Sequence, residues 1–228
     1  MPSTNYMKEL MIDYDFGSTS YTPPSILYFG LSLSVLDATV NNEFIPTAMS
    51  YDGSKHVTLT FNNAINFVAM MPNDTLTVEG VDTAFSTANI DGEWLINSST
   101  PTTVTFTTSV QPTGTTPQTL TGGLVTWAVT NEPNFIGNYA RVGYDNDKVT
   151  WSIAGADTPS HGIITNAIDI VFPQSDLSWG VLKSIFIATN DTTYGGKILW
   201  YDELEPHIPM PAGNTTITFK ANTIEITI

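Results

Sequence analysis

The chain has 228 residues, of which 22 are acidic and only 7 are Lys or Arg, so its formal net charge is −15. This acidity disfavours nucleic acid and anionic membranes as partners, because phosphate groups are bound through Lys and Arg. The absence of cysteine excludes disulfides, thiolate zinc sites and cysteine nucleophiles. With 41% hydrophobic residues, the chain is expected to fold around a packed core.

Only the N-terminal segment has the spacing of a helix. Tyr6 and Leu10, with Met7 and Met11, recur at helical intervals, which predicts a helix from Asn5 to Phe16. Ser3 or Thr4 is available as its cap, and Gly17 is expected to end it. The segment is too acidic for a secretory signal, and no apolar run approaches the roughly 18–20 residues of a membrane span. We therefore expect a soluble chain.

The rest of the chain is dominated by β-strand patterns. Residues alternate between Thr and an apolar side chain, and this period of two is typical of half-buried strands whose Thr face is solvated. The clearest examples are residues 57–61, 103–107, 216–219 and 224–228.

Turn residues separate these runs at short intervals. Asp52-Gly53 and Asp91-Gly92 are hairpin-type dipeptides, and Gly195-Gly196 predicts a long-tipped hairpin between residues 185–188 and 197–201. Residues 220–223 are expected to join the last two strands. The fold class predicted is all-β: an antiparallel β-sandwich, Ig-like or jelly-roll-like, with a short N-terminal helix.

A change of composition predicts a domain boundary. Residues 41–129 are rich in Thr, Ser, Asn and turn residues, whereas the flanking segments are more apolar. We interpret residues 1–40 and 130–228 as one discontinuous outer β-sandwich domain and residues 41–129 as an inserted small β-domain, since insertion at an exposed loop is well tolerated.

Six segments of the outer part, in order, carry a family resemblance. They are Tyr28–Ser32 (YFGLS), Asn138–Val142 (NYARV), Asn166–Pro173 (NAIDIVFP), Asp176–Gly180 with Ile185–Ile187, Gly195–Tyr201 (GGKILWY) and Pro211–Phe219 (PAGNTTITF). Together they resemble a family of small tailed-bacteriophage virion proteins that are labelled capsid-decoration or tail-fibre proteins. The resemblance implies a virion structural protein.

The inner part resembles a different β-module associated with phages. The matching segments are Asp74–Val81, Asn89–Asn97 and Thr102–Phe106. In many relatives of the outer family this insertion is absent.

Two functions follow from the resemblance. The main hypothesis is a capsid cement protein, made in the host cytoplasm and bound to the exterior of the capsid at many equivalent sites of the major capsid protein, as a homo-oligomer with a trimer favoured. The sequence has no heptads or solenoid repeats, which a fibre shaft would show. The alternative is a tail-associated fibre or baseplate protein whose inserted domain contacts the host surface or glycans.

Candidate metal ligands are few. His56, His161 and His207 show no metal-ligand spacing, so structural or surface roles are expected. An EF-hand loop that starts at Asp145 fails, because Thr150 and Ala156 occupy the positions that need Gly and Glu. Residues 145–147 are therefore interpreted as a turn, with an irregular calcium site left open.

Catalytic patterns are equally sparse. Asp202, Glu203 and Glu205 beside Trp200 and Tyr201 suggest either a glycosidase pair or a solvated acidic loop, and the loop is favoured. Nucleophile-elbow, P-loop and zinc-protease motifs are missing from the sequence, so no catalytic, cofactor or metal residue and no enzyme activity is predicted.

The aromatic residues are expected in the cores. Trp179, Trp200 and Phe186 are assigned to the sandwich core. Trp94 and Trp127 are also assigned to a core, with a sugar-stacking platform as the second interpretation.

Overall fold

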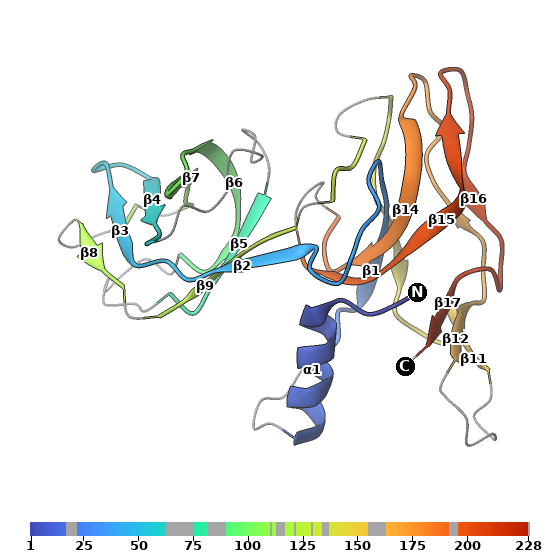
Figure 1. Cartoon of the computed structure of the whole chain (residues 1–228), viewed down its shortest axis with the longest axis horizontal. Coiled ribbons are helices and arrows are strands. Elements are labelled where there is room, and N and C mark those ends of the chain that lie inside the picture. Colours follow the sequence, from blue (N-terminus) through green and yellow to red (C-terminus); the bar gives the residue numbers. More distant parts are fainter. Residues whose placement is uncertain are drawn as a thin grey trace. The chain divides into compact units, whose positions relative to one another are not determined.

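The computed structural model describes residues 1–16, 22–62, 75–81, 90–109, 111–112, 117–120, 122–128, 130–133, 137–154, 163–191 and 196–227. Within these ranges the chain forms one helix and antiparallel β-sheets, which confirms the predicted all-β class (Figure 1). Contacts divide the chain into two compact units. Unit 1 comprises Met1–Asn41, Val129–Thr193 and Lys197–Ile228, and unit 2 comprises Asn42–Ala128 and Tyr194–Gly196. That residues 41–129 fold by themselves stays a prediction.

Unit 1 contains the helix and three sheets. Its elements are α1 (Asn5–Phe16), β1 (Ile26–Ser32), β10 (Val142–Asp145), β11 (Trp151–Ala154), β12 (Ile163–Asn166), β13 (Ile170–Val171), β14 (Gly180–Ala188), β15 (Ile198–Met210), β16 (Thr218–Phe219) and β17 (Glu225–Thr227). The strand orders are β10-β1-β14-β15, β11-β12-β17 and β13-β16. The predicted helix is confirmed, and Gly17 lies outside the described residues.

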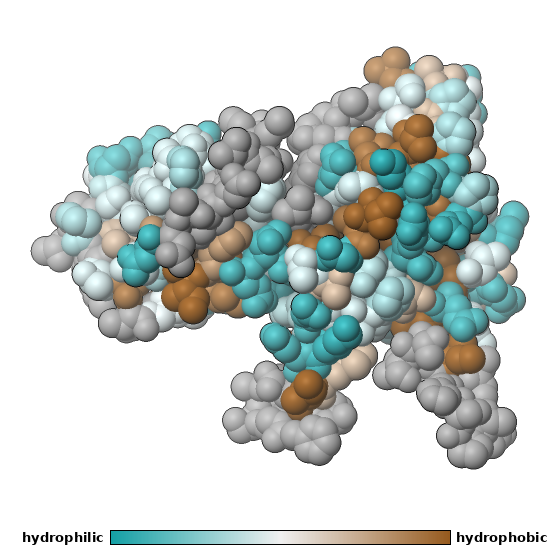
Figure 2. Space-filling view, viewed as in Figure 1, coloured by the Kyte–Doolittle hydropathy of each residue, from teal (hydrophilic) through white to brown (hydrophobic). Residues whose placement is uncertain are grey.

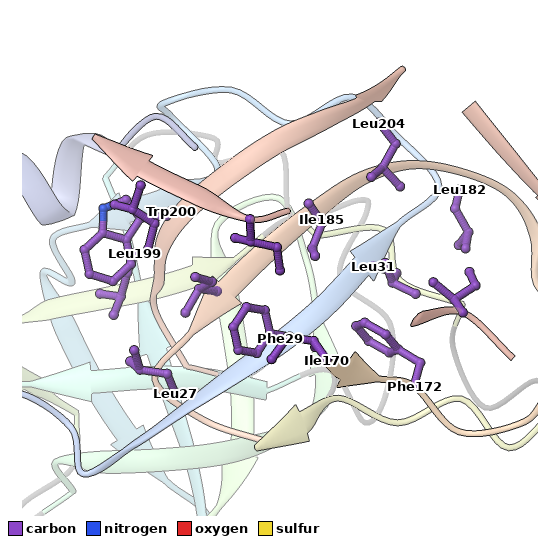
Figure 3. Packing of buried hydrophobic residues seen from close by; sticks show 14 of the residues in the cluster. Leu27, Phe29, Leu31, Ile170, Phe172, Leu182, Ile185, Leu199, Trp200 and Leu204 are labelled. Carbon is purple, nitrogen blue, oxygen red and sulfur yellow. The ribbon is translucent and has the colours of Figure 1, made fainter. Parts of the chain in front are cut away.

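One face of the four-stranded sheet forms the main core of unit 1. Leu27, Phe29 and Leu31 alternate along β1 toward this core (Figure 3). They pack with Ile185 and Ile187 of β14, because residues opposite each other in an antiparallel pair share a face. Trp179 and Trp200 belong to the same cluster and are 2% and 8% exposed, as predicted.

The helix is anchored to this sheet at its first turn. The Thr4 hydroxyl accepts the Met7 N–H at 3.2 Å and donates to the Ile198 carbonyl at 2.7 Å. The Thr4 N–H also donates to the carbonyl of Leu199 at 2.9 Å. Thr4 is therefore the helix cap, and the same side chain joins the helix to β15.

The other face of the four-stranded sheet is buried over its two middle strands, β1 and β14. Phe186 of β14 is fully buried there, and it lies opposite Gly30 in the register of β1 with β14. A Cβ at Gly30 would overlap the Phe186 ring, so the glycine makes room for the aromatic side chain. The Arg141 guanidinium carbon lies 5.0 Å from the centre of the Phe186 ring on the same side.

A buried ion pair lies beside Phe186. Arg141 donates from Nη2 and Nε to the two carboxylate oxygens of Glu132, at 2.6 and 3.0 Å, and both side chains are 0% exposed. The Glu132 carboxylate also accepts the hydroxyls of Thr130 at 2.7 Å and Tyr139 at 2.8 Å. At least four hydrogen bonds thus hold this carboxylate, and they offset its removal from water.

The same network closes the end of β1. The β10 pairing with β1 stops at Val142, which faces Phe29. Beyond it, the Tyr139 hydroxyl accepts the Leu31 N–H at 2.8 Å. Burial, with the Glu132 charge next in importance, raises the pKa of the Tyr139 hydroxyl well above its ordinary value, so it stays a neutral donor and acceptor.

Unit 2 is a curled eight-stranded sheet. Its strands are β2 (Asn41–Phe44), β3 (Ala48–Tyr51), β4 (His56–Thr60), β5 (Thr75–Glu79), β6 (Gly92–Ser99), β7 (Thr103–Thr107), β8 (Gln118–Thr119) and β9 (Leu124–Ala128), in the order β2-β9-β5-β6-β7-β4-β3-β8. The first half of β6 pairs with β5 and its second half with β7, with a bulge between Ile96 and Ser98. Bulges increase local twist and bend a strand.

The alternation predicted for β4 and β7 is confirmed. Val57, Leu59, Val104 and Phe106 are buried in the core of unit 2, and the threonines between them face the other side. Asp52-Gly53 lies in the connection between the paired strands β3 and β4, as predicted, and Gly53 has a φ of 79°.

Three other predicted turns have different outcomes in the structure. Gly92 is the first residue of β6, at the end of a connection that starts at Gly80, so Asp91-Gly92 is not a two-residue hairpin turn. Residues 220–223 join β16 to β17, the last two strands, as predicted; these strands pair with β13 and β12. The predicted pairing around Gly195-Gly196 is correct, since β14 and β15 are neighbours; Gly195 lies outside the described residues.

Replacing Glu132 by Gln should destabilise unit 1 by about 3–5 kcal/mol, because Arg141 then stays buried without a counter-charge. Urea unfolding followed by circular dichroism measures this change. Asp169→Asn, which alters the exposed pair with Lys220, is the matched control and should change stability little. The double variant Glu132→Gln with Arg141→Met should lose less than the sum of the two single changes. Equal losses for Glu132→Gln and Asp169→Asn would contradict this role.

Replacing Gly30 by Ala should cost about 1–3 kcal/mol, since the new methyl group meets the Phe186 ring. Combining it with Phe186→Leu should recover part of that loss, which a double-mutant cycle of unfolding free energies detects. Gly122→Ala is a suitable control, because a Cβ at Gly122 meets no atom within 4 Å. The account of Gly30 fails if the two glycine variants are equally stable.

Candidate functional site

A cavity of about 220 Å³ lies between two sheets of unit 1. Strands of both sheets contribute to it: β1 and β15 from the four-stranded sheet, and β11, β12 and β17 from the three-stranded one. Its lining consists of Leu27, Asn146, Asp147, Lys148, Trp151, Ile164, Trp200 and Ile226. We refer to it below as the tryptophan cavity.

The two tryptophans of this cavity have unusual surroundings. Trp151 is 7% exposed and stacks on Phe29, with ring centres 5.8 Å apart and the planes inclined by 26°. Within the described part of the chain, neither its indole N–H nor that of Trp200 has a hydrogen-bond acceptor, and both nitrogens are buried. A buried donor without a partner costs about 1–3 kcal/mol, so each of the two indoles carries a local cost in stability.

The polar part of the lining comes from one turn. Asp147 Oδ1 accepts the N–H groups of Val149 and Thr150, both at 2.9 Å. Asn146 Nδ2 donates to the Pro24 carbonyl at 3.0 Å, which fixes the turn from the other side. The backbone hydrogen bond from Thr150 is the main reason that the pKa of Asp147 lies below its ordinary value. Asp147 thus acts as a turn-forming side chain, as the sequence favoured.

A more open groove of about 490 Å³ adjoins this turn. It is lined by Ile26, Gly143, Tyr144, Asp145, Asp147, Val149, Thr150 and Ile168. Val149 is 71% exposed, and Ile26 is 36% exposed. The face visible in Figure 2 likewise carries hydrophobic side chains in small groups among hydrophilic ones. Asp147, in the turn at residues 145–150, therefore lines both the tryptophan cavity and this apolar groove.

The histidines that the structure describes lie at the surface. His56 Nδ1 is 2.8 Å from Asp52 Oδ2, and His207 Nε2 is 3.0 Å from Glu203 Oε1. The sequence analysis predicted neither of these histidine–carboxylate pairs. His161 lies outside the described residues. Among the residues that the structure describes, no group of three or more His, Cys, Asp or Glu is arranged to hold a metal ion.

The acidic cluster of β15 does not form a site with the aromatic residues beside it. Asp202, Glu203 and Glu205 are exposed along the strand, whereas Trp200 is in the core. None of the three carboxylates lines either cavity described above. The arrangement matches the solvated interpretation rather than a pair of carboxylates that flank a substrate.

The tryptophans of unit 2 have core positions. Trp94 stacks on Phe106 with ring centres 5.9 Å apart, and its indole N–H donates to the Ile90 carbonyl at 2.7 Å. Trp127 is 5% exposed and belongs to the core of unit 2. Trp94 packs against the same core. The assignment of both tryptophans to a core therefore fits better than a sugar-stacking platform.

Sequence reasoning missed the Glu132–Arg141 network and the tryptophan cavity. Arg141 is one of only seven basic residues, and it lies between apolar neighbours in the segment NYARV. That isolation is a usable signal for a buried charge, since unpaired charges are rarely buried. The cavity leaves no such local signal, because its lining comes from strands far apart in the sequence.

Comparison with known proteins gives a family. Residues 93–227 match the family described as Podophage GP4 fiber I protein gp80. The chain belongs to this family. The match begins in β6 of unit 2 and continues through unit 1 to β17, so it includes the Arg141 segment and most of the tryptophan cavity. No curated protein and no solved structure matches the chain.

Family membership makes the chain a phage virion structural protein, which confirms the virion location predicted from the sequence. Among the described residues, no helix is both long and apolar enough to cross a membrane.

Acid should weaken the turns of both units. Hydrogen bonds from Ser54 and His56 lower the pKa of Asp52 to about 2, and hydrogen bonds also lower the pKa of Asp147. A carboxyl whose pKa is depressed on folding stabilises the fold above the unfolded pKa of roughly 4, and this contribution is lost as pH falls through the folded value. Stability should therefore be level down to about pH 4 and then decline toward pH 2.

Carboxyl NMR titration of Asp52 checks this prediction. The midpoint should lie near 2 in the native chain and rise in Ser54→Ala, while the Asp147 midpoint should be the same in both. A native Asp52 midpoint at the ordinary value for aspartate would contradict the predicted turn.

Proposed function

We propose that the chain is a fibre component of a podophage virion, where it acts by binding and not by catalysis. The match of residues 93–227 to a podophage fibre family supports this assignment. It corresponds to the alternative reading of the sequence, a tail-associated protein, rather than to the capsid cement protein expected first.

The fold suits a rigid binding element. The two middle strands of the four-stranded sheet, β1 and β14, are buried on both faces, by the main core on one side and by Phe186 and the Glu132–Arg141 network on the other. Sandwich scaffolds of this kind carry function in the loops and cavities at their ends. The 145–150 turn, which lines the tryptophan cavity, is a loop of this kind.

The chain is proposed to act as a homo-oligomer, with a trimer favoured, and without nucleic acid or membrane partners. Several large apolar side chains are exposed and available for contacts between copies: Ile12, Val35, Ile45, Leu95, Val149 and Leu177. The net charge of −15 disfavours nucleic acid as a partner.

A capsid cement protein on the outer shell is the second candidate. One observation favours it: the sequence shows neither the heptads nor the repeats that build a fibre shaft, and the chain folds as compact β-units. In that case the major capsid protein would be the partner, at many equivalent sites.

Copy number separates the two candidates. Quantitative mass spectrometry of purified virions, with the major capsid protein as internal reference, should find a handful of copies per particle for a fibre component. Labelling with an antibody to the chain should then mark the tail end. Hundreds of copies, with label spread over the head, would refute the fibre proposal and favour the cement protein.

A further inference from the structure

One edge of the four-stranded sheet in unit 1 carries backbone hydrogen-bonding groups that point away from the sheet. In an antiparallel pair, successive residues direct their N–H and C=O groups alternately toward the partner strand and away from it. Asn146, one position beyond β10, donates to the Ser25 carbonyl at 2.8 Å. By this alternation the backbone groups of Gly143 and Asp145 face away from β1, and within the described part of the chain no strand pairs with β10 on that side.

The opposite edge of the same sheet is protected. The Tyr201 N–H donates to the Pro2 carbonyl at 3.2 Å, so the segment before the helix covers the start of β15. Farther along β15, Pro206 and Pro209 lack the N–H that a pairing strand requires. Proteins normally cover or interrupt the free edges of their sheets in such ways. Among the described residues, β10 has neither a covering strand nor a proline, so it is the edge open to a further strand.

An apolar groove lies along this open edge. The groove of about 490 Å³ described above includes Gly143 and Asp145 in its lining, together with Ile26, Val149 and Ile168. Its volume falls within the roughly 300–1,000 Å³ of pockets that hold a ligand. Because β10 has only four residues, an added strand gains few backbone hydrogen bonds and needs side-chain contacts as well. The exposed side chains of Ile26 and Val149 offer such contacts.

The charges at the groove define the sign of its occupant. Its charged lining residues are Asp145 and Asp147, and both are exposed. A Lys or Arg on an added strand gains from a cross-strand contact with such a carboxylate, whereas a like charge is repelled. A second copy of this chain, with its net charge of −15, brings the same carboxylates to the contact and is disfavoured. The occupant is therefore a basic segment.

We propose that the β10 edge binds an extended, basic peptide segment of a partner protein, which adds a fifth strand to the four-stranded sheet. The backbone of the segment pairs with Gly143 and Asp145, and a branched apolar side chain occupies the groove against Val149 and Ile168. A Lys or Arg of the segment contacts Asp145. This binding is separate from the fibre assignment, because such a contact can hold a virion protein at any position in the particle.

Selection from a library of random linear decapeptides tests the proposal without a known partner. The mRNA-displayed library is panned against the immobilised full-length chain, and the affinities of enriched peptides are measured by fluorescence polarisation. Enriched peptides should combine Lys or Arg with Val, Ile or Leu, and their binding should weaken as salt rises. A selection that yields no binder, or only binders without basic residues, would overturn the proposal.

Matched variants locate the binding. Asp145→Asn removes the charge and keeps the N–H, so peptide affinity should fall about threefold. Asp145→Pro also removes the N–H that faces away from β1, so the sheet should stay folded while affinity falls about a further tenfold. Val149→Ser should cost about fivefold in affinity, whereas Val35→Ser changes another exposed valine and should bind like the native chain. Equal affinities of the native and Asp145→Pro chains would contradict strand addition.

Amide hydrogen exchange of the ¹⁵N-labelled native chain needs no variant. Without peptide, the N–H groups of Gly143 and Asp145 should exchange rapidly, whereas that of Tyr144, which faces β1, should be protected. An excess of a selected peptide should protect Gly143 and Asp145 as well. If their exchange is unchanged at saturation, the peptide binds elsewhere and the proposal is wrong, even where Asp145→Pro fails to fold.

Analytical ultracentrifugation distinguishes a partner from a second copy. The native and Asp145→Pro chains should sediment alike, because contacts between copies are not expected at β10. A native oligomer that dissociates in Asp145→Pro would show that β10 pairs with its own copy, and would overturn the assignment of a basic partner. None of these outcomes alters the copy number of the chain in virions, so the fibre assignment stands or fails separately.

Discussion

The hydrogen-bonded ion pair between Glu132 and Arg141 is the constraint on which unit 1 depends. Both side chains are fully buried, so each needs the other to offset its loss of hydration. Because the pair lies over Phe186 and joins Tyr139 at the end of β1, it holds the connection before β10 against the four-stranded sheet. The two middle strands, β1 and β14, can therefore be buried on both faces, although only one of these faces packs in the main core.

Two-sided burial also explains the glycine on β1. Gly30 is required because Phe186 of the neighbouring strand fills the space where its side chain would be. The long strands β14 and β15 pair with register shifts between Leu182 and Ser184 and between Ile187 and Ala188. A sheet fixed on one face in this way gives the opposite face a defined position, which is what the tryptophan cavity needs to keep its shape. The cavity then carries a local cost, the two unpaired indole donors, on an otherwise well-packed scaffold.

Local patterns predicted much of the fold. The alternation of Val57, Leu59, Val104 and Phe106 with threonine identified β4 and β7, and Thr4 marked the start of the helix, because these signals lie within a few residues of one another. Asp91-Gly92 lies at the end of a longer connection between the paired strands β5 and β6, because a dipeptide does not reveal the length of the loop that contains it. Residues 216–219 and 224–228 were recognised as strand segments, but their partners, β13 and β12, depend on the whole topology.

The candidate site could not be predicted from local patterns, because it also depends on how distant segments of the chain come together. Trp200 was expected in the core, and it is there, but its unpaired N–H depends on what surrounds it in space. The tryptophan cavity joins residues from Leu27 to Ile226, nearly the full length of the chain. The family resemblance supplied the virion role, and residues 93–227 carry the family match. Neither source indicated where on the molecule a ligand would bind.

A cryo-electron microscopy map of the intact virion tests the account most directly. If the chain is a fibre component, as its family match indicates, its density should lie in the fibres. Density for the chain spread over the capsid surface would contradict the account.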